Sequence, residues 1–109
     1  DVDLLIVDHY GIDAHWHSKV RDYCKKIFII DDLANRHLDC DFLLNSSFIN
    51  KDKDYTKFIS KKDYVSFLGP NYALIDPKFS NLRLQAKKKR EHTSSIQEIL
   101  IFMGFFLFK

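Results

Sequence analysis

Glycine is scarce in this 109-residue sequence, which contains only Gly11, Gly69 and Gly104. Three isolated glycines cannot form a GxGxxG fingerprint, a P-loop or a GxSxG nucleophile elbow. A nucleotide, if bound, is therefore not held by a standard phosphate-binding loop of these residues. Cysteine is also scarce. Cys24 and Cys40 have neither CxxC spacing nor a flanking histidine cluster, so we expect buried reduced thiols rather than a disulfide or a metal site.

Long hydrophobic runs are missing as well. The apolar segment Ile99–Phe108 has ten residues, whereas a membrane-spanning helix needs about 20. Residues 1–8 contain three aspartates and no basic residue, unlike a secretory signal peptide. These absences predict a cytoplasmic protein with no membrane partner. The hydrophobic fraction of 46% and the aromatic fraction of 15% indicate a globular chain with a core and exclude a disordered one.

Charge is unevenly distributed, although the formal net charge is only +2. Residues 1–45 contain nine acidic and five basic residues, whereas residues 46–109 contain six acidic and twelve basic ones. The basic excess lies in Lys51–Lys62 and Arg83–Arg90. Such runs attract a phosphate-bearing ligand or nucleic acid in some proteins and are solvated faces in others. Aromatic residues are not interleaved with the second run, so we do not expect a nucleic-acid partner.

Strand and helix patterns alternate in the first half of the chain. Leu4–Val7 and Ile27–Ile30 are apolar runs that end in acid, which is typical of strands buried on both faces. Between them we expect a helix with its N-cap at Asp13. Its apolar stripe has four members: Ile12, Trp16, Val20 and Tyr23. A strand, a helix and a strand joined by short links form a βαβ unit, so the fold class is α/β with a Rossmann-like parallel sheet.

The second half contains fewer regular patterns. Phe42–Leu44 predicts a third strand, and the polar residues 48–62 predict a loop with one short helical turn around Tyr55–Ile59. Tyr64–Leu68 alternates weakly and ends at the turn signal Gly69-Pro70.

A second helix and a last strand are expected nearer the carboxyl end. Asp76 and Pro77 predict an N-cap and first position for a helix that continues to about Arg90. A break at Glu91–Ser95 precedes the predicted strand Ile99–Met103.

Polar residues follow three of the predicted strands, at 8–10 (DHY), 31–32 (DD) and 45–47 (NSS). In an open parallel sheet, ligands bind beyond the carboxyl ends of the strands, so we expect these clusters along one rim. Any α/β protein also places polar residues where strands run into loops. The pattern therefore predicts their proximity more firmly than it predicts a ligand.

His9 and Tyr10 are the most informative pair on this rim. A histidine can transfer protons near neutral pH, and a tyrosine hydroxyl can orient a water or a sugar hydroxyl. The alternative interpretation of His9, and the one that loop histidines in general favour, is a hydrogen-bonded loop residue. Asp31 and Asp32 could supply a general base, pair with Arg36, or form a strand-end turn that one of them caps.

Two further histidines give no indication of a metal site. His15 and His17 are two positions apart on the predicted helix and do not share a face, so we expect surface side chains. We expect neither a metal nor a cofactor.

Three segments resemble one known family: LLIVDHYGID at 4–13, IIDDLANRHLDCDFLLN at 29–45, and FLGPNYALIDPKF at 67–79. In this order and spacing they resemble the nucleotide-sugar hydrolases of bacterial pseudaminic acid biosynthesis. The resemblance implies a glycosyltransferase-B-like enzyme with two Rossmann-like domains. Such enzymes release UDP, without a metal, from a UDP-linked diacetamido-trideoxyhexose bound between the domains.

The resemblance also implies roles for individual residues. Tyr10 matches the tyrosine that assists catalysis in the family. The family's catalytic histidine lies on a glycine-rich loop that has no counterpart here, and His9 does not replace it. Five residues of the matching segments are candidates for substrate binding: Asp8, His9, Asp32, Asn45 and Tyr72.

The sequence departs from the family after residue 103. Met103-Gly104-Phe105 stands where the family has a Gly-Gly-x-Asp-like turn that opens its UDP-binding domain, and phenylalanine there prevents close approach to a phosphate. We therefore expect residues 1–75 to be the second half of an N-terminal domain and 76–95 to be a linking helix and connection. Residues 96–109 would be the first strand of a truncated C-terminal domain.

Function is the least constrained expectation. We expect residues 1–109 alone to be inactive as a hydrolase, with the exposed apolar tail Phe105–Phe108 favouring aggregation. A stand-alone module that binds a sugar or a protein partner without catalysis is the alternative. A related enzyme of the same fold that acts on another sugar is a third possibility. The oligomeric state is not predicted.

Overall fold

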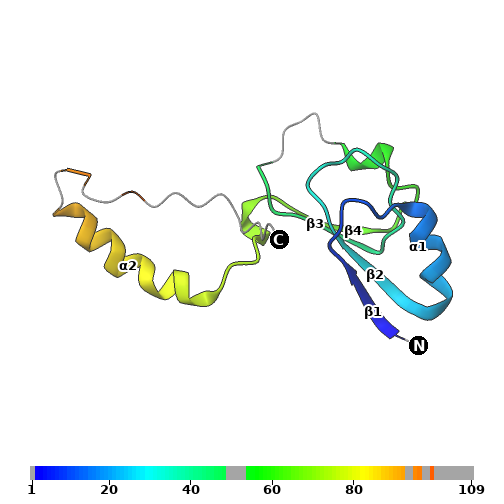
Figure 1. Ribbon diagram of the computed structural model, residues 1–109, viewed down its shortest axis with the longest axis horizontal. Helices are drawn as coiled ribbons and strands as arrows, with labels where there is room; N and C mark the ends of the chain where they lie inside the picture. The colour runs from blue at the N-terminus through cyan, green and yellow to red at the C-terminus, as the bar shows by residue number, and fades with distance from the viewer. Residues whose placement is uncertain (1, 49–53, 93–94, 97–98, 100–109) are drawn as a thin grey trace, which may run out of the picture. The chain divides into compact units, whose positions relative to one another are not determined.

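The computed structural model describes residues 2–48, 54–92, 95, 96 and 99 (Figure 1). The chain divides into two compact units, Asp1–Leu74 and Ile75–Lys109. Within the described residues, no helix combines the length and the apolar character needed to cross a membrane.

The first unit is built on a parallel sheet with the strand order β1-β2-β3-β4, which confirms the predicted α/β, Rossmann-like class. The strands are β1 (Val2–Val7), β2 (Cys24–Ile30), β3 (Phe42–Asn45) and β4 (Val65–Leu68). The α-helix α1 (Ala14–Val20) and the short 3-10 helices η1 (Arg21–Tyr23) and η2 (Tyr55–Lys57) lie between the strands, and a third 3-10 helix, η3 (Pro70–Tyr72), follows β4. The short turn expected near Tyr55 is therefore present.

The parallel register brings the carboxyl ends of the first three strands together. Val7 pairs with Ile29, and Ile30 pairs with Leu44. Beyond the paired residues, the amide of Asp31 donates to the carbonyl of Leu44 at 3.0 Å. The polar residues that follow these strands consequently begin at one level of the sheet.

One face of the sheet carries the core. Ile27, Ile29 and Leu43 are buried there, with Cys40 and Tyr55 packed against them. Burying an aliphatic side chain of this size contributes roughly 1.5–3 kcal/mol. These contacts join β2 and β3 to the loop before β4.

The opposite face corrects one expectation. Leu4–Val7 was predicted to be buried on both faces, but Leu4 and Ile6 are 43% and 60% exposed. The reason is that Leu4 and Ile6 lie on the face opposite the core, in a strand at one edge of the sheet, whereas Val7 lies on the core face and is buried. On the same exposed row, Ile6, Phe28, Phe42 and Val65 are in register, and the Phe28 and Phe42 rings stack at 6.1 Å.

Helix α1 begins as predicted but presents a different face. The Asp13 carboxylate caps it by accepting from the amides of His15 and Trp16 at 3.0 and 3.3 Å. His17, expected on the surface, is fully buried, whereas Trp16 and Tyr23 of the predicted stripe are exposed. The helix ends at Val20, so the helical spacing stops before Tyr23.

The chain leaves β4 through a turn that requires glycine. Gly69 has a φ of 101° and a ψ of 172°, a region that only glycine adopts without strain. The adjacent 3-10 helix, η3, begins with Pro70.

The described residues of the second unit include one long helix, α2 (Pro77–Glu91). The Asp76 carboxylate caps it by accepting from the Lys78 amide at 2.9 Å, with Pro77 in the first turn, as predicted. None of its side chains is buried. The expected strand Ile99–Met103, apart from Ile99, and the tail Phe105–Phe108 lie outside the described residues.

Candidate functional site

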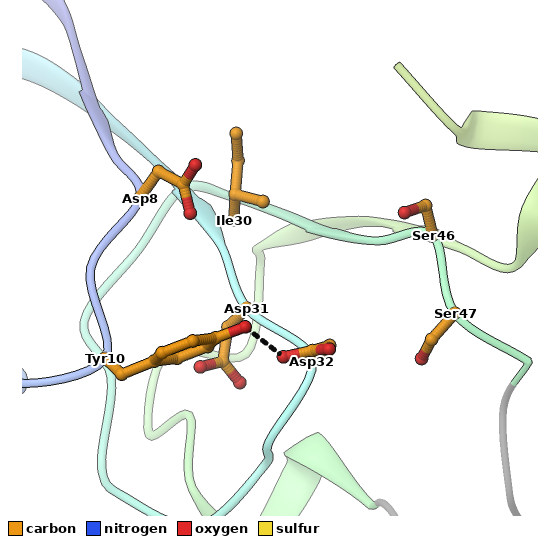
Figure 2. A pocket seen from close by; sticks show the side chains of 7 residues that line it. All are labelled: Asp8, Tyr10, Ile30, Asp31, Asp32, Ser46 and Ser47. Atoms are coloured by element: carbon orange, nitrogen blue, oxygen red, sulfur yellow. Dashed lines mark hydrogen bonds between the residues drawn. The ribbon is translucent and has the colours of Figure 1, made fainter. Parts of the chain in front are cut away.

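A pocket of about 200 Å³ lies at the carboxyl rim of the sheet (Figure 2). It draws residues from the ends of β1, β2 and β3, which confirms that the three predicted clusters converge. Seven residues line it: Asp8, Tyr10, Ile30, Asp31, Asp32, Ser46 and Ser47. Its walls therefore offer carboxylates and hydroxyls, and none of the residues that the structure describes lines it with a cationic side chain.

Tyr10 reaches from the end of β1 to the end of β2. Its hydroxyl donates to Oδ1 of Asp32 at 2.8 Å (Figure 2). The hydrogen bond to Asp32 and the charge of that carboxylate raise the pKa of the Tyr10 phenol above its ordinary value. The phenol is consequently neutral across the physiological pH range.

Asp31 forms the floor of the site. Its buried carboxylate accepts from the amides of Leu33 and Ala34 at 3.2 and 3.0 Å and from Nη1 of Arg36 at 2.5 Å. Burial alone would raise the pKa of Asp31, but these hydrogen bonds outweigh it and lower the pKa. Two of the predicted alternatives, the pair with Arg36 and the capped turn, are thus both present.

Arg36 connects the two loops that supply Asp31 and Tyr10. Besides its contact with Asp31, it donates from Nε to the carbonyl of Ile12 at 2.8 Å and from Nη2 to that of His9 at 3.1 Å. Sequence reasoning treated Arg36 only as a partner of the aspartates. The two carbonyl groups that it contacts in the β1–α1 loop are 24 and 27 positions away in the sequence, so no local pattern indicated these hydrogen bonds.

Asn45, a predicted substrate-binding residue, faces inward and does not line the pocket. Its Nδ2 donates to the hydroxyl of Tyr55 at 3.1 Å, and its Oδ1 accepts from the amide and hydroxyl of Ser47 at 2.9 and 2.6 Å. Asn45 holds the loop that carries Ser47. Tyr55 was not among the predicted site residues, because its segment was predicted as a loop with one short helical turn and does not follow the end of a predicted strand.

The other predicted site residues differ in position. Asp8 lines the pocket, whereas His9 and Tyr72 do not. Nδ1 of His9 accepts from the amide of Gly11 at 3.0 Å, so it is a hydrogen-bonded loop histidine. That nitrogen is occupied as an acceptor, and a neutral His9 carries its proton on Nε2. Tyr72 packs its ring edge against Phe67, with centroids 5.5 Å apart.

Ion pairs cluster near the start of β3, at the end of the strands opposite the rim pocket. The buried carboxylate of Asp41 contacts Nη1 of Arg21 at 2.5 Å, the amide of Ile27 at 2.8 Å and Nζ of Lys61. Burial alone would raise the pKa of Asp41, but the bonds from Lys61 and Arg21 lower it strongly. This cluster holds together η1, β2 and the segment before β4.

A second depression, of about 400 Å³, lies beside this cluster. Ser60, Lys61, Lys62 and Tyr64 are among its lining residues. The ammonium of Lys61 is engaged by Asp41, which gives part of the predicted basic run Lys51–Lys62 a structural role.

The cysteines have the expected structural character. Cys24 and Cys40 are free and buried. Burial raises the pKa of Cys40 to about 12, so its thiol is un-ionised and a poor nucleophile at neutral pH. Among the described residues, no group of three histidine, cysteine, aspartate or glutamate side chains could hold a metal ion.

Comparison with known proteins gives a partial relationship. No protein-family model matches the chain. The chain is 37% identical over 90 residues to the UDP-2,4-diacetamido-2,4,6-trideoxy-beta-L-altropyranose hydrolase of Campylobacter jejuni, which covers 82% of this chain and 31% of that protein. It is 21% identical over 105 residues, 94% of this chain and 21% of the relative, to an uncharacterized protein of Methanocaldococcus jannaschii. The chain thus spans less than a third of the length of either curated relative.

Proposed function

We propose that this chain is part of a nucleotide-sugar hydrolase and that the rim pocket binds the sugar of a UDP-linked diacetamido-trideoxyhexose. The 37% identity over 90 residues with the Campylobacter jejuni hydrolase carries the proposal. Tyr10, Asp8 and Asp32, three of the residues assigned to the site by the family resemblance, come together in one pocket, which supports it.

The chemistry of the pocket favours the sugar over the diphosphate. The Asp8 carboxylate accepts hydrogen bonds from sugar hydroxyls and amide N–H groups, the Asp32 carboxylate is engaged by Tyr10, and Ser46 and Ser47 can donate or accept. The same carboxylates repel a diphosphate, which proteins commonly bind with cationic side chains or backbone amides. We therefore place the UDP portion outside this pocket.

These contacts suggest a role for each residue around the pocket. Tyr10 orients the sugar or the attacking water, while Arg36 and Asn45 hold the loops around it. Hydrolysis also needs a base for the water and stabilisation of the departing diphosphate. The family's histidine base has no counterpart among these 109 residues, so we expect the chain alone to bind the sugar without releasing UDP.

Titration of the uniformly ¹⁵N-labelled chain tests this proposal by NMR. We expect the free 2,4-diacetamido-2,4,6-trideoxyhexose to shift the amide signals of Tyr10, Ser46 and Ser47, and UDP alone to leave them in place. Ser46→Ala should weaken sugar binding. The matched control Ser60→Ala lies in the second depression, which Lys61 and Tyr64 also line, and should leave sugar binding unchanged.

Two results would contradict the proposal. One is a sugar titration that leaves the rim signals unchanged, and the other is a shift of these signals by UDP in the absence of sugar. Release of UDP from the UDP-linked sugar by this chain, abolished in Tyr10→Phe, would overturn the expected lack of activity. Sugar binding by a longer chain without any UDP release would favour the non-catalytic module.

A further inference from the structure

Tyr10, the tyrosine among the described residues that line the rim pocket, has Asp32 as its hydrogen-bond partner. The Tyr10 side chain is 58% exposed, and its hydroxyl lies 2.8 Å from Oδ1 of Asp32. The two residues are 22 positions apart, at the ends of β1 and β2. Figure 2 shows the ring reaching along the pocket wall, with the hydroxyl directed at Asp32. The bond therefore determines where this ring lies relative to the pocket.

The chemistry of the two groups gives this bond a direction. A phenol has one proton to donate and two lone pairs that accept, whereas an ionised carboxylate only accepts. While Asp32 is ionised, the Tyr10 proton must point to it. The Tyr10 oxygen can then only accept a hydrogen bond from a ligand.

We propose that Asp32 is a positioning residue that holds the Tyr10 ring at the rim pocket and makes its hydroxyl an obligate acceptor. The ligand group that meets Tyr10 is therefore a donor: a sugar hydroxyl, an acetamido N–H or a water. The identity of the ligand rests on the proposed function, whereas the Tyr10–Asp32 bond does not. Asp32 acts through Tyr10 and needs no contact with the sugar.

The electrostatic surroundings of Tyr10 allow a sharp test. The bond to Asp32 and the charge of that carboxylate are the two largest causes of the raised pKa of Tyr10, and Asp8 acts only through its charge and more weakly. Asp8 and Asp32 line the same pocket. Asp8→Asn is consequently a matched control, since it removes a neighbouring charge without touching the hydrogen bond.

The first experiment titrates the full chain labelled with ¹³Cζ-tyrosine, with the Tyr10 signal assigned by its loss in Tyr10→Phe. We expect Asp32→Asn to lower the Tyr10 midpoint, because it removes both the hydrogen bond and the charge of the carboxylate. Asp8→Asn should lower it clearly less. An unchanged midpoint in Asp32→Asn, or an equal decrease in Asp8→Asn, would overturn the proposal.

The second experiment measures binding of the free diacetamido-trideoxyhexose. We expect Tyr10→Phe and Asp32→Asn each to weaken binding about fivefold, with the double variant no weaker than either single one, because both remove the same positioned hydroxyl. Effects that multiply in the double variant would overturn the positioning role. No sugar binding by the unmodified chain would refute the proposed function, whereas the titration of Tyr10 would still decide the role of Asp32.

Discussion

The hydroxyl of Tyr55 lies 2.8 Å from the main-chain carbonyl oxygen of Asp31 and 3.0 Å from its Oδ2 atom. Both side chains are buried, and Nδ2 of Asn45 donates to the same hydroxyl at 3.1 Å. A residue of the segment before β4 thus connects Asp31, after the end of β2, with Asn45, at the end of β3. Burial and the charge of Asp31 raise the pKa of the Tyr55 phenol, so it is un-ionised at neutral pH.

Tyr55→Phe should destabilise the protein by about 1–3 kcal/mol, because Asp31 and Asn45 would lose a buried hydrogen-bond partner. Urea unfolding, followed by circular dichroism, measures the free energy of unfolding. Tyr23→Phe is the matched control: its side chain is 70% exposed, so the same loss of a hydroxyl should cost less than about 0.5 kcal/mol. Equal effects of the two variants would contradict a structural role for the Tyr55 hydroxyl.

Asp41 should make the protein sensitive to acid. Its pKa is lowered in the folded state from the ordinary 3.8, so at low pH the unfolded chain binds more protons than the folded one. The stabilisation by this carboxylate is present above pH 3.8 and decreases as the pH falls below that value. Thermal unfolding between pH 7 and acidic pH measures this loss.

Removing the charge of Asp41 should make the protein less stable at neutral pH and less dependent on pH. We expect Asp41→Asn to cost about 2 kcal/mol, since Arg21 and Lys61 lose a charged acceptor. Asp3→Asn, which removes the 83% exposed partner of Lys25, should leave both the stability and the acid response nearly unchanged. An acid response in Asp41→Asn as steep as in the unmodified chain would refute this role.

His17 should give a second pH dependence, at higher pH. Burial lowers its pKa below the ordinary 6.5, and the charge of Arg36 also lowers it, whereas that of Asp39 raises it. The unfolded chain therefore takes up a proton first, and the free energy of unfolding decreases as the pH falls below 6.5. Asp13 and Arg21, the other charged groups near His17, contribute in opposite directions.

Substitution of the two histidines of α1 tests this prediction. His17→Gln should flatten the decrease in melting temperature below pH 6.5, although it also destabilises the core. His15→Gln, at an exposed position of the same helix, should leave the pH profile unchanged. The slope of melting temperature against pH is the decisive quantity. A lost packing contact alone would lower the melting temperature at every pH and leave this slope unchanged.

The apolar row on the sheet face opposite the core should promote self-association. It consists of Ile6, Phe28, Phe42 and Val65. Ile6 and Val65 are 60% and 48% exposed on the sheet face opposite the core, and an apolar edge strand readily pairs with another chain. Ile6→Lys should shift the chain toward monomer in size-exclusion chromatography with light scattering. Tyr23→Lys adds the same charge away from this row and should have no such effect; equal effects would mean that net charge, and not the strand face, controls association.

Much of the architecture could be predicted from local patterns. The apolar runs that became β2 and β3, the capping aspartates Asp13 and Asp76, and the turn at Gly69 each depend on neighbouring residues, which interact whatever the rest of the chain does. Parallel pairing then required the polar residues after the strands to meet at one rim. These expectations are confirmed because short-range sterics and strand direction are sufficient to produce them.

The tertiary structure decided which side chains the rim and the core actually use. The burial of His17, the inward turn of Asn45 and the exposure of Ile6 depend on which face of each element is covered, and helical or strand spacing does not specify that. The bond between Tyr10 and Asp32 joins residues 22 positions apart. By itself, the sequence therefore determined where the polar residues after the strands would gather, whereas long-range packing decided which of these groups face the pocket and which hold its loops in place.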